Sequence, residues 1–276
     1  MIIPWGISIS RCRQVARLPF VALAFMLCSA SASGASWEGY QRLTREELLA
    51  LIAQTPQGSK PEIYAKNLSD VDLSGVDFRG ANLSASVFNG ARLMRATLDR
   101  CNLTVSFLEG ADLTGASLRE AVLFSTQLAG AHLNGADLTG ARLIGDLRSV
   151  DLSKANLTRM NAAADMKNQS MGLMRTNIVN ARAIEADFSD SDFSRADFSF
   201  SDLSRAKMPR AKLYRAEFSG AMLVGADLTG ADLRESVLID TDLSGANLTN
   251  ADLTGATFRG VRGLDTATTT GTRGLP

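Results

Sequence analysis

A leucine or phenylalanine occurs at every fifth residue from Leu68 to Leu143, sixteen times in one unbroken phase. From Leu173 to Phe258, seventeen of the eighteen corresponding positions hold Leu, Phe, Ile or Met, and Ala183 is the exception. A period of five is neither the roughly 3.6 residues of a helix nor the two of a strand. Because a fixed period defines the architecture before any local assignment, the chain is predicted to be a solenoid.

Each five-residue unit combines inward-facing and turn-forming positions. Two residues before the central Leu or Phe stands a small residue such as Ala111, and the residue directly before it is often Asp or Asn, as at Asp112. Ser or Thr and then Gly frequently follow the centre. One large and one small inward residue in every five suit short extended steps joined at corners. Asp, Asn, Ser and Gly favour such corners because they bond nearby backbone or tolerate unusual backbone angles.

Written in fives, the chain contains units such as VDLSG, ADLTG and ANLTN. These units resemble the pentapeptide-repeat family, whose A-(D/N)-L-x-x pattern they repeat in phase over residues 66–260. The resemblance implies an all-β fold, a right-handed quadrilateral β-helix with four pentapeptides per coil and coils about 4.8 Å apart. It also implies that Phe198 stacks on Phe218, with Phe188 and Phe193 on neighbouring faces. The filled interior would leave no lumen for a substrate.

The first 32 residues have the features of a cleavable secretory signal. Three arginines give it a basic start: Arg11, Arg13 and Arg17. The apolar run at residues 18–28 is too short to cross a bilayer, which needs about 20 residues. We expect cleavage after Ala32 or Ala35, a periplasmic or secreted mature chain, and no stable membrane insertion after cleavage. The alternative is an uncleaved tail or a misassigned start codon.

Removal of residues 1–32 changes the charge balance slightly. It takes away three arginines and no acidic residue, which leaves 26 basic residues against 29 acidic ones, a net charge of −3. Cys101 is then the only cysteine, at a small inward position. A single thiol forms no internal disulfide, which is compatible with any compartment. Stability is therefore expected to come from the stacking of the coils.

Residues 33–65 differ from the repeat in composition. A capping-box pattern, TREE, occupies residues 44–47 and opens an apolar run. It predicts a short α-helix over residues 45–54 that ends before Pro56. An open solenoid end exposes backbone groups and apolar side chains, so we interpret this helix as the N-terminal cap. A partner-binding helix is the alternative.

Residues 261–276 lack the five-residue pattern and are rich in threonine. We predict a flexible C-terminal tail without a helix, which would leave the last regular coil uncovered. Many members of the pentapeptide-repeat family dimerise through this end. The resemblance therefore implies that a homodimer can form through the C-terminal coils.

The repeat is irregular over residues 144–172. Leu147 follows Leu143 by four residues, and the original phase has returned by Leu173, thirty residues after Leu143. One deletion and one compensating insertion would fit the length of six regular units. Two interpretations stay open: an irregular coil with a small bulge near residues 159–172, or a protruding recognition loop. Loops on rigid scaffolds often carry function, and in topoisomerase-protecting relatives such loops matter to activity.

Apolar side chains are predicted to gather beside this irregular segment. Phe124 and Ile144 each follow an inward Leu and lie twenty residues apart, so they should stack on one outer face next to Val122. Exposed apolar clusters can mark partner sites, although single surface hydrophobes are common. The predicted partner surface consists of seven residues: Phe124, Ile144, Val122, Arg159, Met166, Lys167 and Asn168.

The residues before each centre form columns of mixed charge when they are read every twenty residues. Three columns illustrate this: Asp72, Arg92, Asp112 and His132; Asp187, Lys207, Asp227 and Asn247; Asp192, Lys212, Asp232 and Asp252. Neighbouring opposite charges favour the stack. The best-known activity of the family is DNA mimicry toward type II topoisomerases, which needs columns of like charge such as phosphates supply. Mixed columns make this the second hypothesis.

The sequence offers no constellation for catalysis. His132, the only histidine, is predicted to face outward, with neither a nearby nucleophile nor metal-ligand spacing. The basic residues between Arg195 and Arg215 are spread around the solenoid by their spacing, so no nucleic-acid patch is predicted. We therefore predict a non-enzymatic, exported structural or protein-interaction scaffold with an unknown protein partner and no cofactor, metal or nucleic acid. A secreted effector is a further alternative.

Overall fold

The computed structural model describes residue 37 and residues 39–164 and 175–276. The chain divides into two compact units, residues 1–38 and residues 39–276. Every element below belongs to the second unit. The predicted signal peptide and its cleavage sites lie outside the described residues.

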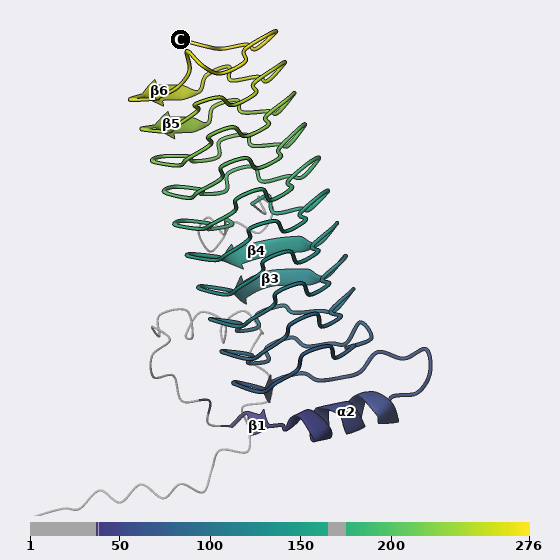
Figure 1. Ribbon diagram of the computed structural model, residues 1–276. Coiled ribbons are helices and arrows are strands. Elements are labelled where there is room, and N and C mark those ends of the chain that lie inside the picture. Colours follow the sequence, from purple (N-terminus) through teal and green to yellow (C-terminus); the bar gives the residue numbers. More distant parts are fainter. Residues whose placement is uncertain (1–36, 38, 165–174) are drawn as a thin grey trace, which may run out of the picture. The chain divides into compact units, whose positions relative to one another are not determined.

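The second unit is a stack of coils joined by parallel backbone pairing (Figure 1). In regular coils a residue pairs with the one twenty positions later, as Asp72 does with Arg92 and Arg92 with Asp112. This is the right-handed quadrilateral β-helix that the sequence predicts. Glu62 already pairs with Asn82, so the ladder starts before residue 66. The named elements are β1 Gln41–Arg42, α2 Arg45–Gln54, β2 Lys66–Asn67, β3 Val122–Gln127, β4 Arg142–Asp146, β5 Val237–Ile239 and β6 Thr257–Arg259.

Two kinds of side chain fill the interior. The central Leu or Phe and the small residue two positions earlier are both buried, as at Leu113 and Ala111, each 0% exposed. The rings of Phe198 and Phe218 stack with 5.2 Å between centroids and 2° between planes, as the twenty-residue spacing predicts. Each buried Leu or Phe contributes about 1.5–3 kcal/mol of transfer free energy. The continuous core is therefore the main source of stability.

Asp and Asn recur before the centre because their side chains shape the corner. The side-chain oxygen accepts a hydrogen bond from the backbone N–H two residues later, as Asp112 Oδ1 does from Thr114 at 3.0 Å. The residue after this N–H donor adopts a left-handed backbone, as Gly115 does with φ 64°. Glycine tolerates this conformation best. Longer polar residues also take this position, such as Arg210 at φ 56°. Their side chains then project from the corners.

Helix α2 spans the predicted residues, begins with the predicted capping box and closes the first coil. Leu48 and Ile52 on its inner side are buried in the same core as the coils. The Arg45 guanidinium donates to the carbonyl oxygens of Asp72 at 2.7 Å and Ser74 at 3.1 Å. The helix therefore covers apolar side chains, and Arg45 supplies donors to backbone carbonyls at the end of the stack.

The C-terminal segment, residues 261–276, continues the ladder, so the prediction of a flexible tail is wrong. Three of its residues pair with the preceding coil: Arg262 with Asp242, Thr268 with Asn247 and Arg273 with Asp252. Pairing uses backbone groups, which remain available where the Leu-centred pattern ends. Val261, Leu264 and Leu275 pack against the core but stay only partly buried.

A one-residue deletion opens the irregular segment, as predicted. Strands β3 and β4 pair in register through Phe124 and Ile144, after which Thr126 faces Gly145. The coil that contains this step is one residue shorter than a regular one. Glycine is needed at position 145 because a Cβ atom there would collide with the carbonyl oxygen of Thr126.

The insertion that follows is larger than predicted. Asn161 pairs with Asp192, thirty-one residues later, where a regular coil has twenty. The eleven extra residues and the one deleted residue differ by ten, a multiple of five, so the phase returns. A single extra residue would have compensated the deletion, so the expected small insertion is wrong in length. Residues 165–174, which include most of the predicted bulge or loop, are not among the described residues.

Candidate functional site

The predicted apolar group lies on strands β3 and β4, and only part of it is exposed. Phe124 pairs with Ile144, which confirms that the two residues stack. Val122 is 37% exposed and Phe124 is half-buried, but Ile144 is only 2% exposed. The prediction of an outward Ile144 is therefore wrong. Strand β4 continues without the corner residue present in β3, so Ile144 lies inside a continuous strand rather than at an outward corner.

Arg159 is the remaining predicted surface residue that the structure describes, since Met166, Lys167 and Asn168 lie outside the described residues. Arg159 is exposed at a corner with φ 56°. Asn161, two residues later, belongs to the same column as Val122, through Arg142 between them. Arg159 therefore lies at the corner that leads into the face of Val122, two coils away.

Sequence reasoning missed Thr176, which joins the two sides of the insertion. Its buried hydroxyl donates to the carbonyl oxygen of Ala162 at 2.8 Å and lies 3.2 Å from that of Leu143. Buried Ser and Thr at this position of regular coils make one such bond to the preceding coil, as Ser106 does to Leu83 at 2.8 Å. The second bond, to Ala162, links the described residues on the two sides of residues 165–174.

Arg175 was also missed, and it neutralises two acids on the next coils. Asp197 and Glu217 face each other on adjacent coils, an arrangement of like charges that destabilises a sheet. Arg175 donates to both, at 2.8 Å from separate nitrogens. The Asp197 side chain is only 11% exposed. The available sequence signal was two acids twenty residues apart, which the four-sided coil places next to each other.

The predicted charge columns are confirmed by the pairing register. Arg92 lies 2.9 Å from Asp72, and Lys212 lies 3.5 Å from Asp192. Hydrogen bonds from Ser74 and then from Arg92 hold the pKa of the Asp72 carboxyl far below its usual range. Exposed pairs of this kind add little stability individually. They do place opposite charges next to each other within the columns, unlike the phosphates of DNA.

A second set of ion pairs, which sequence reasoning missed, joins corner residues on adjacent coils. Four pairs have this arrangement: Arg100–Glu120, Glu185–Arg205, Asp190–Arg210 and Arg215–Glu235. The Arg210 Nε atom lies 2.6 Å from Asp190 Oδ1. Their signal was the same twenty-residue spacing, at the last position of each five-residue unit.

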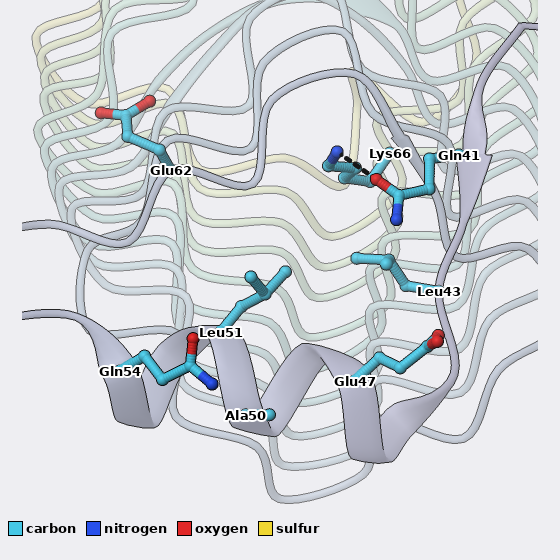
Figure 2. Close-up of a pocket in the computed structure, with 8 residues that line it drawn as sticks. All are labelled: Gln41, Leu43, Glu47, Ala50, Leu51, Gln54, Glu62 and Lys66. Carbon is cyan, nitrogen blue, oxygen red and sulfur yellow. Dashed lines mark hydrogen bonds between the residues drawn. The ribbon is translucent and has the colours of Figure 1, made fainter.

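A cleft of about 350 Å³ lies between helix α2 and the edge of the first coil (Figure 2). Eight residues line it: Gln41, Leu43, Glu47, Ala50, Leu51, Gln54, Glu62 and Lys66. Lys66 donates to Gln41 at 2.7 Å, and Glu62 accepts from Asn82 at 2.7 Å. Two carboxylates against one ammonium give the cleft a negative balance. The sequence predicted the helix but not this cleft.

Among the described residues, no three His, Cys, Asp or Glu side chains are placed to hold a metal ion. His132 is exposed within its column between Asp112 and Asp151. Burial raises the pKa of the Cys101 thiol to about 12, so it stays protonated. Within the described part of the chain, no helix is long and apolar enough to cross a membrane.

The repeat region matches the family described as pentapeptide repeats. The match comprises eight copies over residues 67–104, 108–140, 173–210, 191–230 and 226–262. These ranges together cover more than half of the chain. None of the curated protein sequences matches this chain.

Several solved structures are similar to this chain, including the following three. HetL, a pentapeptide repeat protein involved in heterocyst differentiation regulation from the cyanobacterium Nostoc sp. strain PCC 7120, is 28% identical over 83% of this chain and 98% of its own, with a TM-score of 0.33. Full-length QnrB1, a plasmid-mediated fluoroquinolone resistance protein, is 15% identical over 73% and 92%, with a TM-score of 0.37. A pentapeptide repeat protein from the Arabidopsis thaliana thylakoid lumen is 25% identical over 57% and 71%, with a TM-score of 0.17.

Proposed function

The chain belongs to the pentapeptide-repeat family, and we propose that it is a non-enzymatic, exported scaffold that presents its outer surface to a protein partner. The observation that carries this proposal is the filled interior, in which packed side chains form one core from Leu43 to Leu253. Interactions with other molecules are therefore left to the outer faces. A solenoid holds side chains on those faces at fixed spacings, which suits recognition of another protein.

The face beside the insertion is our first choice for the partner surface. It combines Val122 and Phe124 with the exposed Arg159. Thr176 and Arg175 fix the point at which the chain rejoins the coils. Rigid support beneath a chain segment that leaves the repeat is typical of recognition sites.

Site-specific photo-crosslinking in the producing cell tests this surface. A photoreactive residue at position 159 should give a crosslink to another protein. The matched control at Lys207, exposed on a regular coil, should give little. Equal crosslinking at the two positions would place the partner surface elsewhere.

Export rests on the basic start, the short apolar run and the two cleavage sequences near residue 32. Expression of the full chain in a Gram-negative host should yield a periplasmic or extracellular product that begins after Ala32 or Ala35. Its N-terminus and intact mass measure the cleavage. A Leu23→Arg variant, whose apolar run is broken, should stay unprocessed in the cytosol. Cytosolic recovery of the unmodified chain with residues 1–32 retained would overturn the export proposal.

Protection or inhibition of a type II topoisomerase is the second candidate, and the family resemblance favours it. The mixed charge columns and the export features weigh against it. Mature protein that inhibits DNA supercoiling at micromolar concentration would reverse this order. A secreted effector differs from the first proposal only in being released from the cell. Recovery of the product from the medium rather than the periplasm distinguishes the two.

The C-terminal end supports a further proposal, a homodimer. The last coil has partly buried apolar residues, including Phe258, Val261 and Leu264, and a second copy stacked on it would bury them. Sedimentation at micromolar concentration should then give twice the chain mass. A monomer under these conditions would remove the proposal.

A further inference from the structure

We propose that the cleft beside α2 binds an extended peptide that pairs with the backbone of Glu62 and carries a basic side chain between two apolar ones. This site lies apart from the face near Arg159 and goes beyond the scaffold function. It requires neither export nor a dimer.

In regular coils the residue before the centre turns both of its backbone groups toward the preceding coil. The Asn82 N–H donates to the Pro61 carbonyl, and the Asn82 carbonyl accepts from the Ile63 N–H, both at 2.8 Å. Glu62 occupies the same position one coil earlier. Neither its N–H nor its carbonyl oxygen bonds to any described residue. Glu62 therefore offers a donor and an acceptor at the edge where a preceding coil would pair.

The chain itself covers two other edges of this coil. Strand β1 pairs with β2, and the Arg45 guanidinium binds the carbonyl oxygens of Asp72 and Ser74. At Glu62 the helix stands away from the edge and leaves the cleft between them (Figure 2). Its volume of about 350 Å³ falls within the range of about 300–1,000 Å³ typical of ligand sites. An unpaired edge beside a cleft is the arrangement used for β-strand addition.

The side chains around the cleft define the peptide sequence. A peptide residue opposite Glu62 in parallel register would point outward beside the Glu62 carboxylate, because paired residues share a face. A Lys or Arg fits there, and the second carboxylate, Glu47, adds to the attraction. The residues before and after it would point to the other face. Leu43 and Leu51 line the cleft, and Leu51 is 37% exposed, so apolar side chains suit those two positions.

Titration of the mature chain, residues 33–276, with the peptide acetyl-Ala-Val-Lys-Val-Ala-amide tests the proposal. Two-dimensional NMR should show saturable shifts that include the Glu62 amide. The same peptide methylated on the nitrogen of the second Val cannot donate to the Glu62 carbonyl, and we expect about tenfold weaker binding. Replacing Lys with Glu in the peptide should weaken binding by a similar factor.

Two tryptophan variants of the helix supply the matched control on the protein. Ala50 lines this cleft, and Ala53 lines the other side of the helix beside Gly75 and Asp77. Both alanines are exposed, so both variants should fold, which thermal unfolding checks. Ala50→Trp should abolish binding by filling the cleft, whereas Ala53→Trp should leave it unchanged.

Three results would overturn the proposal. The first is the absence of saturable binding up to about 1 mM peptide, because a dissociation constant above that value is too weak for a specific site. The second is equal binding of the N-methylated peptide, which would exclude strand pairing. The third is self-association of the chain alone that Ala50→Trp abolishes, because the occupant would then be a second copy.

Discussion

The regular coils and the interrupted coil are stabilised in different ways. In regular coils the same contacts recur along the stack: a buried Leu or Phe, a side-chain bond to the corner N–H, and a pair of backbone bonds to the next coil. The interrupted coils, one a residue short and the next with eleven extra residues, depend in addition on contacts of particular side chains. These are Gly145 against Thr126, the second bond of Thr176, and the two ion pairs of Arg175.

Residue identity therefore matters more in the interrupted coils than in the regular ones. A regular unit tolerates many residues at its outward positions, because its neighbours repeat the same backbone pairing. Where one coil is a residue short and the next has eleven extra, particular side chains must close the backbone. The same substitution should therefore cost more free energy at the interruption than in a regular coil.

The largest difference is expected for Gly→Asn. Asn already occupies regular corners, as at Asn180 with φ 57°, and nothing lies within 4 Å of a Cβ at Gly135. Gly135→Asn should change the free energy of unfolding by less than about 0.5 kcal/mol. Gly145→Asn should cost about 1–3 kcal/mol, because its Cβ meets the Thr126 carbonyl. Urea denaturation of the mature chain measures both, and equal costs would contradict the comparison.

Thr→Val substitutions should give the next largest difference. Thr176→Val removes both hydrogen bonds of the hydroxyl and should cost about 1–2 kcal/mol. Thr241, buried in a regular coil, makes one short bond, to the Phe218 carbonyl at 2.8 Å. Thr241→Val should cost about 1 kcal/mol. A larger loss at Thr241 would mean that the bond to Ala162 does not stabilise the closure.

The same contrast separates what the sequence predicts from what it does not. The five-residue period predicts a solenoid, and the family resemblance adds four units per coil, from which the Phe198–Phe218 stack and the charge columns follow. The length of the insertion could not be predicted. The restored phase shows that the net number of added residues is a multiple of five, but not which multiple. The paired segment at residues 261–276 was missed for a related reason: backbone pairing continues without the Leu that marks it.

The candidate surface was less predictable than the fold. Val122 is exposed as expected, but the burial of Ile144 depends on how β4 passes the missing corner. Arg175 lies twenty-two residues from Asp197 and forty-two from Glu217, across the interrupted coil. No repeat spacing links it to either acid. The open Glu62 edge depends on where α2 lies, and the helix sequence does not contain that information.

Removal of Arg175 should have a smaller effect. Arg175→Met leaves Asp197 and Glu217 facing each other, and we expect the free energy of unfolding to fall by about 0.5–1 kcal/mol at neutral pH, reduced by solvent screening. Arg182→Met is the matched control and should cost less, because Arg182 lies 3.9 Å from Asp151 in a weaker pair. Urea denaturation of the mature chain measures both, and equal losses would show that Arg175 contributes no more than an ordinary exposed pair.

The smallest effect is expected at a regular corner, and it tests the ladder directly. A hydrogen bond from Arg210 holds the pKa of the Asp190 carboxyl below its usual range. Because the folded pKa is lowered, the pair stabilises the fold above the ordinary pKa, and this contribution is lost as pH falls through the lowered value. In Arg210→Met the pKa of Asp190 should rise toward the usual range of an Asp carboxyl, as carboxyl NMR titration would show, while neutral-pH stability should barely change. Lys207→Met, on the same coil, should leave the Asp190 titration unaltered. If Arg210→Met also left it unaltered, the corner ion pair would be absent in solution, and the regular coils would rest on their core and backbone pairing alone.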